Sequence, residues 1–217
     1  MKVINLGGSP SVLNSFIAEM RDRRIQKDRL RFRTNLERVG EVFAYEISKT
    51  LDYSEKEVET PLGIAKVSTF DTPLVLATIL RAGLPLQQGL LQVFDHAETA
   101  FLATFRKYGK GDWYEIRVDY CTAPSLEGKT LILSDAMLAT GSSIEVTLQK
   151  LIEEYGKPAH IHLVCPIASR YAVDYLAQRY GDEMTLWVAA EDEEITSRSY
   201  IIPGIGDAGD LAFGNKL

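Results

Sequence analysis

Short apolar runs alternate with amphipathic stretches along most of the chain. A helical period of apolar positions predicts helices over residues 14–25, 28–51, 85–93, 142–155 and 169–180. Short continuous apolar runs bounded by turn residues predict strands at 73–80, 98–105, 131–134, 159–165 and 185–190. This alternation of strands and helices predicts an α/β fold, in which helices cover both faces of a largely parallel sheet.

Two further segments predict antiparallel pairs. Residues 58–67 are interrupted by Thr-Pro-Leu-Gly at 60–63, which is typical of a two-stranded ribbon. Residues 115–120 are expected to close a hairpin with the strand at 98–105, across a polar, glycine-containing loop at 108–112 that we expect to be mobile. With 217 residues and 46% hydrophobic content, the chain suits a single domain over 1–217, with an N-terminal helical segment at about 11–51.

The overall charge narrows the class of partner. A net charge of −6 argues against broad binding to nucleic acids or membrane surfaces. The sequence has no apolar run of membrane-spanning length and no signal-peptide pattern at its start, so a cytoplasmic location is expected. The two cysteines, Cys121 and Cys165, lie in unlike contexts and predict no disulfide.

The most informative stretch runs from Leu131 to Ser143. An apolar strand ends in Asp135, a loop of small residues follows, and a helix begins at about residue 142. Ligands of open α/β sheets bind at the carboxyl ends of strands. Small residues allow close backbone approach, and the free N–H groups of a helix start favour a phosphate. The loop is neither a Walker sequence nor Gly-x-Gly-x-x-Gly. The alternative is an ordinary strand–turn–helix corner capped by hydroxyl groups.

A second segment, 200–214, reads Tyr-Ile-Ile-Pro-Gly-Ile-Gly-Asp-Ala-Gly-Asp-Leu-Ala-Phe-Gly. Its glycines and proline predict that it contains no regular element. A solvated linker would not carry so many large apolar side chains, so we expect the segment to be a loop folded against the rest of the molecule.

Together these segments resemble a known family. The stretch 131–143 resembles the 5-phosphoribosyl-1-diphosphate (PRPP) loop of phosphoribosyltransferases, here 135–143. The segment 200–214 resembles the base-binding loop of the uracil phosphoribosyltransferases. Residues 79–84, Ile-Leu-Arg-Ala-Gly-Leu, resemble the loop of that family that contacts diphosphate. The resemblance implies a type I phosphoribosyltransferase fold, with a small hood formed partly by the C-terminal loop. It also implies that uracil and PRPP give UMP and diphosphate, in pyrimidine salvage.

The resemblance also implies roles for individual residues. Arg81 and a closing Arg106 would meet the diphosphate, Asp135 would hold the ribose hydroxyls, and 140–143 would hold the 5′-phosphate. Asp207 and Arg106 are the expected catalytic residues. The residues expected to bind PRPP are Arg81, Arg106, Asp135, Ala136, Met137, Leu138, Ala139, Thr140, Gly141, Ser142, Ser143 and Asp207. The residues expected to bind uracil, mostly through backbone groups, are Ile201, Gly206, Asp207 and Ala208.

Other implied properties concern cofactors and assembly. Mg²⁺ is expected to be held mainly by PRPP, with no direct side-chain ligand, and the chain is expected to form a homodimer or a higher homo-oligomer. Activation by GTP is left open. The sequence departs from the family at Ala136 and Ser142, where uracil enzymes typically have proline and glycine. It departs again after Phe105-Arg106, where an acidic stretch is usual.

Three charged or polar clusters have two interpretations each. The seven basic residues of 21–33 could bind RNA, as in a pyrimidine regulator on the same scaffold, but pairing with acids elsewhere in the chain is favoured. His160 and His162 share a strand face and could bind a metal, but a structural role is favoured. The acidic run 191–194 could attract Mg²⁺, but a solvated loop is favoured. A phosphoribosyltransferase for a different base is the other alternative function.

Overall fold

The computed structural model describes residues 1–108 and 114–216. Its centre is a seven-stranded sheet in the order β1-β11-β9-β7-β4-β5-β6. The strands are β1 (Lys2–Asn5), β4 (Leu74–Leu80), β5 (Glu98–Tyr108), β6 (Tyr114–Thr122), β7 (Thr130–Ser134), β9 (His160–Val164) and β11 (Met184–Val188). All neighbouring pairs are parallel except β5 and β6, which form an antiparallel hairpin. The predicted, largely parallel α/β sheet is therefore confirmed.

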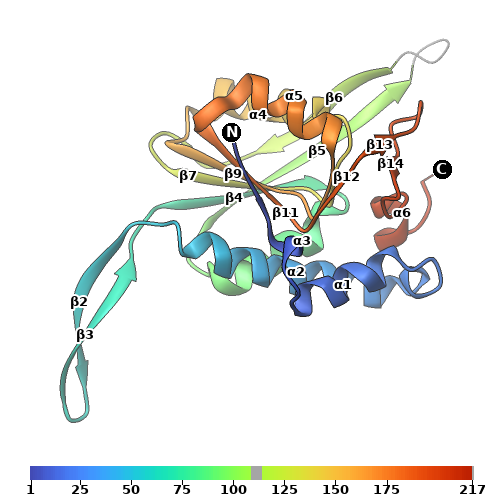
Figure 1. Cartoon of the computed structure of the whole chain (residues 1–217). Coiled ribbons are helices and arrows are strands. Elements are labelled where there is room, and N and C mark those ends of the chain that lie inside the picture. Colours follow the sequence, from blue (N-terminus) through green and yellow to red (C-terminus); the bar gives the residue numbers. More distant parts are fainter. Residues whose placement is uncertain (109–113, 217) are drawn as a thin grey trace.

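Helices cover both faces of this sheet (Figure 1). Helices α1 (Val12–Arg21), α2 (Arg29–Ser48) and α3 (Gly83–Val93) lie on one face, while α4 (Ser142–Tyr155) and α5 (Arg170–Tyr180) lie on the other. A last short helix, α6 (Ala208–Phe213), stands at the edge of the molecule beside the C-terminus. Short 3-10 turns occur at Leu6–Gly8, Ile25–Lys27 and Gly181–Glu183.

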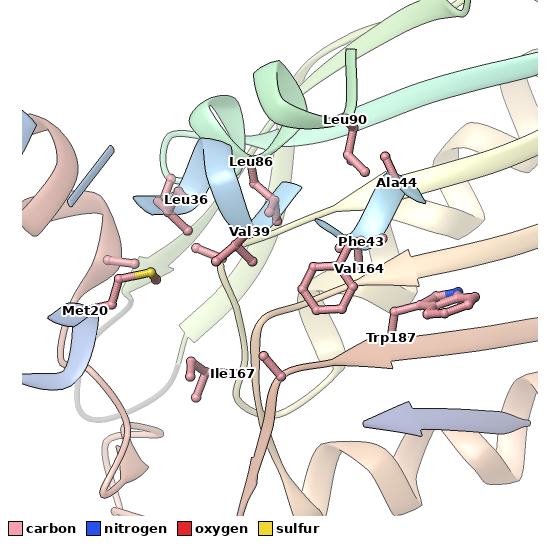
Figure 2. Packing of buried hydrophobic residues seen from close by; sticks show 14 of the residues in the cluster. Met20, Leu36, Val39, Phe43, Ala44, Leu86, Leu90, Val164, Ile167 and Trp187 are labelled. Atoms are coloured by element: carbon pink, nitrogen blue, oxygen red, sulfur yellow. The ribbon is translucent and has the colours of Figure 1, made fainter. Parts of the chain in front are cut away.

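The helix α2 forms because its sequence offers both a start signal and an apolar stripe. The Asp28 side chain accepts a hydrogen bond from the Arg31 N–H at 3.0 Å and so caps the first turn. Five apolar side chains at helical spacing then face the sheet and are fully buried: Phe32, Leu36, Val39, Phe43 and Ile47. Figure 2 shows this layer, in which side chains of α2 and α3 pack against Val164 and Trp187 of the sheet.

The opposite face of the sheet carries a second apolar layer. Alternate residues of the inner strands point to this side and pack under α4 and α5. The buried members from α4 are Ile144, Leu148 and Leu151. Gly141 and Gly156 flank the helix α4 with φ angles of 81° and 94°, a backbone region that glycine enters without strain.

Smaller sheets connect the loops at the carboxyl edge of the main sheet. A parallel three-stranded sheet has the order β12 (Ala190–Asp192), β10 (Ile167–Ser169) and β8 (Met137–Leu138). Strands β13 (Glu194–Ile195) and β14 (Ile201–Ile202) form an antiparallel pair. The predicted ribbon is the hairpin of β2 (Tyr53–Thr60) and β3 (Gly63–Phe70), which extends away from the body of the molecule in Figure 1.

Two predictions about local structure were wrong. The helix expected at 14–25 ends at Arg21, because the Asp22 backbone turns extended and its carboxylate accepts the N–H groups of Arg24 and Ile25. The segment 200–214 contains regular elements, since it includes β14 and α6. Helix α6 forms despite its glycine because Asp207 caps its first turn. Residues 109–112 of the loop expected to be mobile lie outside the described part of the chain.

Candidate active site

A cavity of about 740 Å³ opens at the carboxyl edge of the central sheet. It is lined by the end of β4, the loop after β7, the segment 198–200 and the start of α6. The lining residues are Ile79, Leu80, Arg81, Ala82, Ala103, Thr104, Phe105, Asp135, Ala136, Met137, Leu138, Ala139, Thr140, Gly141, Ser143, Ile144, Arg198, Ser199, Tyr200, Asp207, Ala208, Gly209 and Lys216. Segments far apart in the sequence therefore meet where open α/β sheets bind ligands.

Asp135 follows β7 directly and is half-buried in the cavity floor. Its Oδ1 accepts a hydrogen bond from the Ala136 N–H at 2.7 Å, and its own N–H donates to the Val164 carbonyl at 3.1 Å. Burial raises the pKa of the Asp135 carboxyl to about 7, although the N–H groups of Ala136 and Met137 act in the opposite direction. The site therefore holds a carboxylate whose charge is poorly compensated by the protein alone.

The loop after Asp135 leads into the start of α4. Strand β8 fixes its first part by pairing with β10, and the Ser169 hydroxyl donates to the Ala139 carbonyl at 2.6 Å. Thr140, Gly141 and Ser143 line the cavity at the N-terminus of α4. This helix start presents free N–H groups and two hydroxyls, which is the environment that a phosphate prefers. Ser142 does not line the cavity.

Arg81 lies at the end of β4 and reaches across to the C-terminal segment. Its Nη2 forms a salt bridge with Asp210 at 2.8 Å, and its Nη1 donates to the Gly214 carbonyl at 3.1 Å. The Arg81 Nε is buried and has no hydrogen-bond partner among the described residues. A buried donor without an acceptor is costly, so this atom points to a ligand that would accept its hydrogen bond.

The segment 200–214, which is expected to bind the base, is held in place by a buried salt bridge. Arg21 and Asp192 form a two-pronged salt bridge with distances of 2.8 and 2.9 Å. Arg21 also donates to the Gly204 carbonyl, and Asp192 accepts the Gly204 N–H, each at 2.9 Å. Asp192 is only 7% exposed, so this pair anchors the loop firmly to α1 and β12.

The predicted base-binding residues take different places. Asp207 and Ala208 line the cavity, and the Asp207 carboxylate caps α6 by accepting the Asp210 N–H at 3.0 Å. Ile201 is buried in β14, and neither it nor Gly206 is among the lining residues. Gly206 has a φ of 89°, which shapes the turn into α6.

Arg106 has its backbone in β5, paired with Ile116. Its side chain lies outside what the structure describes.

Several lining residues were not predicted from the sequence, namely Thr104, Phe105, Arg198, Ser199, Gly209 and Lys216. Arg198 lies two residues before the segment 200–214, so a basic residue flanking that segment was an available signal.

Three of the seven basic side chains of 21–33 contact acids or a carbonyl group elsewhere in the chain, as the favoured interpretation predicts. In the basic segment, Arg21 pairs with Asp192, Arg31 pairs with Glu19 at 2.6 Å, and Arg33 donates to the Ala212 carbonyl at 2.7 Å. An RNA-binding regulator gains no support from them.

The two histidines are part of the sheet's packing. The His162 Nδ1 accepts the indole N–H of Trp187 at 3.1 Å, and burial lowers the pKa of His162 to about 4. His160 bonds to the Thr185 hydroxyl at 3.0 Å. Across residues 1–108 and 114–216, no group of three or more histidine, cysteine or acidic side chains could hold a metal ion. The acidic run is not simply solvated, since Asp192 is buried and Glu191 pairs with Arg170 at 2.6 Å.

An acid at a strand tip, the start of a helix suited to phosphate and an arginine meet around one cavity, as expected for the phosphoribosyltransferase class of α/β proteins. The structure is similar to that of the AQ2163 protein from Aquifex aeolicus, with a TM-score of 0.86 and 29% identity over 98% of both chains. The sequence profile described as uracil phosphoribosyltransferase matches residues 9–215. The chain belongs to the uracil phosphoribosyltransferase family.

Relatives from two further organisms agree with this assignment. The chain is 52% identical to a uracil phosphoribosyltransferase of Porphyromonas gingivalis over the full length of both proteins. It is 34% identical to one of Thermococcus gammatolerans, over 99% of this chain and 94% of that protein. In the described part of the chain, no helix is long and apolar enough to cross a membrane.

Proposed function

We propose that the cavity at the carboxyl edge of the sheet binds PRPP and uracil side by side and joins them. The chain is an enzyme that transfers the 5-phosphoribosyl group of PRPP to uracil, giving UMP and diphosphate. In this reaction positive charge spreads over the sugar while negative charge builds on the leaving diphosphate. The protein's task is therefore to position the partners and to stabilise those charges.

The diphosphate is assigned to the Arg81 side of the cavity. A guanidinium can bind phosphate oxygens through two parallel N–H groups. The buried Nε of Arg81 is one such donor, and it has no hydrogen-bond partner among the described residues. The Nη2 of Arg81 is held by Asp210, so PRPP would either join or replace that salt bridge. Arg106 remains a second proposed contact, from the sequence alone.

The sugar and its phosphate are assigned to the loop 135–143. The Asp135 carboxylate would accept hydrogen bonds from two ribose hydroxyls. These donors would stabilise the charged form of Asp135, which burial disfavours. The 5′-phosphate would lie on the free N–H groups at the start of α4, with the hydroxyls of Thr140 and Ser143 as further donors.

Uracil is assigned to the wall formed by Tyr200 and Asp207–Ala208. Backbone groups of 201–208 would present a donor, an acceptor and a donor to its edge, and the 4-amino group of cytosine would then face a donor. Asp207 lines the cavity beside Ala208 and would lie between the base and PRPP. We assign it to the stabilisation of charge at the base nitrogen during transfer.

The cavity fits Mg²⁺ bound chiefly through the substrate. Both lining carboxylates, Asp135 and Asp207, already accept backbone N–H groups and do not form a cluster with a third acid in the described residues. A hard ion that keeps waters and substrate oxygens as ligands suits such a site, and it would neutralise diphosphate charge when bound. The homodimer and a response to GTP stay predictions from the resemblance, and the cytoplasmic location stays a prediction from the sequence.

The observation that carries the proposal is the meeting of Arg81, Asp135, the start of α4 and Asp207 around one cavity. The test is a panel of bases with PRPP and Mg²⁺, in which the nucleotide product is identified by mass. UMP from uracil, with little product from cytosine, hypoxanthine or adenine, is the expected result. Equal rates with a purine would reject the assignment of the base site.

A further inference from the structure

A side-chain cluster behind the phosphate loop has no role in the assignments above. It consists of Glu145 in the first turn of α4 and of Tyr175 and Arg179 on α5. The Tyr175 hydroxyl donates to the Glu145 Oε2, and the Arg179 Nε donates to the Glu145 Oε1 at 2.7 Å. Both oxygens of one carboxylate are therefore occupied by donors from the neighbouring helix.

The position of Glu145 explains why such pairing would matter. Its N–H bonds to the Gly141 carbonyl at 3.0 Å, so the residue lies one turn from the helix start that faces the cavity. A carboxylate in a first helical turn interacts favourably with the helix dipole. The same charge repels a phosphate at that helix start, and a free carboxylate would compete with the phosphate for the exposed N–H groups.

The ring of Tyr175 also supports the loop by contact. A Cβ atom placed on Gly141 would lie 2.9 Å from the Tyr175 Cδ1, so the ring lies directly against this left-handed residue of the loop. The Arg179 guanidinium carbon lies 3.5 Å from the centre of the same ring, an arrangement that orients the ring by cation–π attraction.

We propose that Tyr175 and Arg179 are positioning residues for phosphoribosyl transfer, which neutralise Glu145 and hold it away from the phosphate site at the start of α4. The inference rests on the proposed function of that site. It concerns the binding of PRPP and not the chemical step, because these side chains do not line the cavity. The Arg179 and Glu145 side chains are 38% and 22% exposed, so their salt bridge adds little to folding stability, and its loss should leave the fold intact.

The test is a set of variants measured by steady-state kinetics and by thermal unfolding with and without PRPP. Tyr175→Phe removes only the hydroxyl, and Arg179→Gln removes the positive charge together with the hydrogen bond to Glu145. Each is expected to raise KM for PRPP about twofold to fivefold, the usual range for a charge near a helix start, while kcat and KM for uracil stay unchanged. Tyr171→Phe is the matched control, since Tyr171 stacks on Tyr175 one turn away, and it should behave like the parent.

Glu145→Gln separates positioning from a merely structural role. Once the carboxylate is gone there is no charge to neutralise, so adding Tyr175→Phe or Arg179→Gln to this variant should no longer change KM for PRPP. The proposal is overturned if the single variants bind PRPP as the parent does, or if their defect persists beside Glu145→Gln. If the parent protein makes no UMP, the proposed function is rejected. The positioning proposal is tested separately, by comparing how far PRPP raises the melting temperature of the parent and of each variant.

Discussion

Replacing Asp135 by asparagine should make the protein more stable at high pH while removing its use of PRPP. Burial raises the pKa of Asp135 from 3.8 to about 7. A carboxyl with a raised pKa binds more protons in the folded state than in the unfolded state, so its contribution to stability falls as the pH rises from about 4 to 7. Above that window the folded protein carries the full cost of the buried charge.

The magnitude follows from the size of the shift. One pKa unit corresponds to about 1.36 kcal/mol, so ionisation of Asp135 lowers the free energy of unfolding by up to about 3 kcal/mol between about pH 4.5 and about pH 8.5. This is an upper limit, because the residue is half-buried and water still reaches it. Asparagine would carry no such charge, and its amide has one acceptor oxygen where the carboxylate has two.

Urea unfolding of the parent and the Asp135→Asn variant at both pH values is the assay. The variant should gain stability relative to the parent as the pH rises, and PRPP should no longer protect it from unfolding. A stability difference that is the same at both pH values would refute the buried-charge reasoning. A variant that still binds PRPP as the parent does would refute the assignment of the ribose to Asp135.

Further variants test the lining of the cavity and the anchoring of the segment 200–214. Arg81→Ala should weaken PRPP binding by on the order of 1.5–3 kcal/mol, roughly 10- to 150-fold in KM, and an unchanged KM would remove Arg81 from the site. Asp207→Asn keeps an N-cap for α6 but loses the charge, so kcat should fall while directly measured uracil binding holds; a loss of uracil affinity alone would show that Asp207 only shapes the pocket. Arg21→Ala removes the salt-bridge partner of the buried Asp192, so it should lower the free energy of unfolding by about 2–3 kcal/mol and raise KM for uracil. Arg31→Ala removes a more exposed salt bridge and should change neither quantity. Equal effects of the last two would contradict the anchoring of the base loop.

Much of the fold could be predicted because the patterns were local and strong. The helix predicted at 142–155 matches α4 at both ends, since a glycine precedes it and another follows it. The apolar stripe of α2 is as clear in the sequence as in the core, from Phe32 to Ile47. The alternation of these elements with short apolar strands was sufficient for the parallel sheet.

The missed elements depend on contacts that are distant in sequence. Strand β1 is only four residues long and forms because β11 provides a partner for its edge. The two residues of β8 are a strand only because β10 lies beside them, and that pairing fixes the shape of the PRPP loop. Helix α6 exists through the cap of Asp207 and its contact with α2, which the glycines of 200–214 concealed.

In the candidate site, too, the local segments could be predicted and the contacts between distant residues could not. The segments that form it could be recognised from the sequence, and Arg81, Asp135, Thr140 and Asp207 all line one cavity. The partners of those residues could not be predicted. The salt bridge of Arg81 with Asp210 joins positions 129 residues apart, and nothing in either segment alone indicates it.

The most direct test of the account is a crystal structure of the protein with its product, UMP. The 5′-phosphate should lie on the N–H groups at the start of α4, the ribose hydroxyls should donate to Asp135, and the uracil ring should lie against Tyr200 and Ala208. UMP bound in the opposite orientation, or anywhere other than this cavity, would contradict the central claim that these segments form the site of phosphoribosyl transfer.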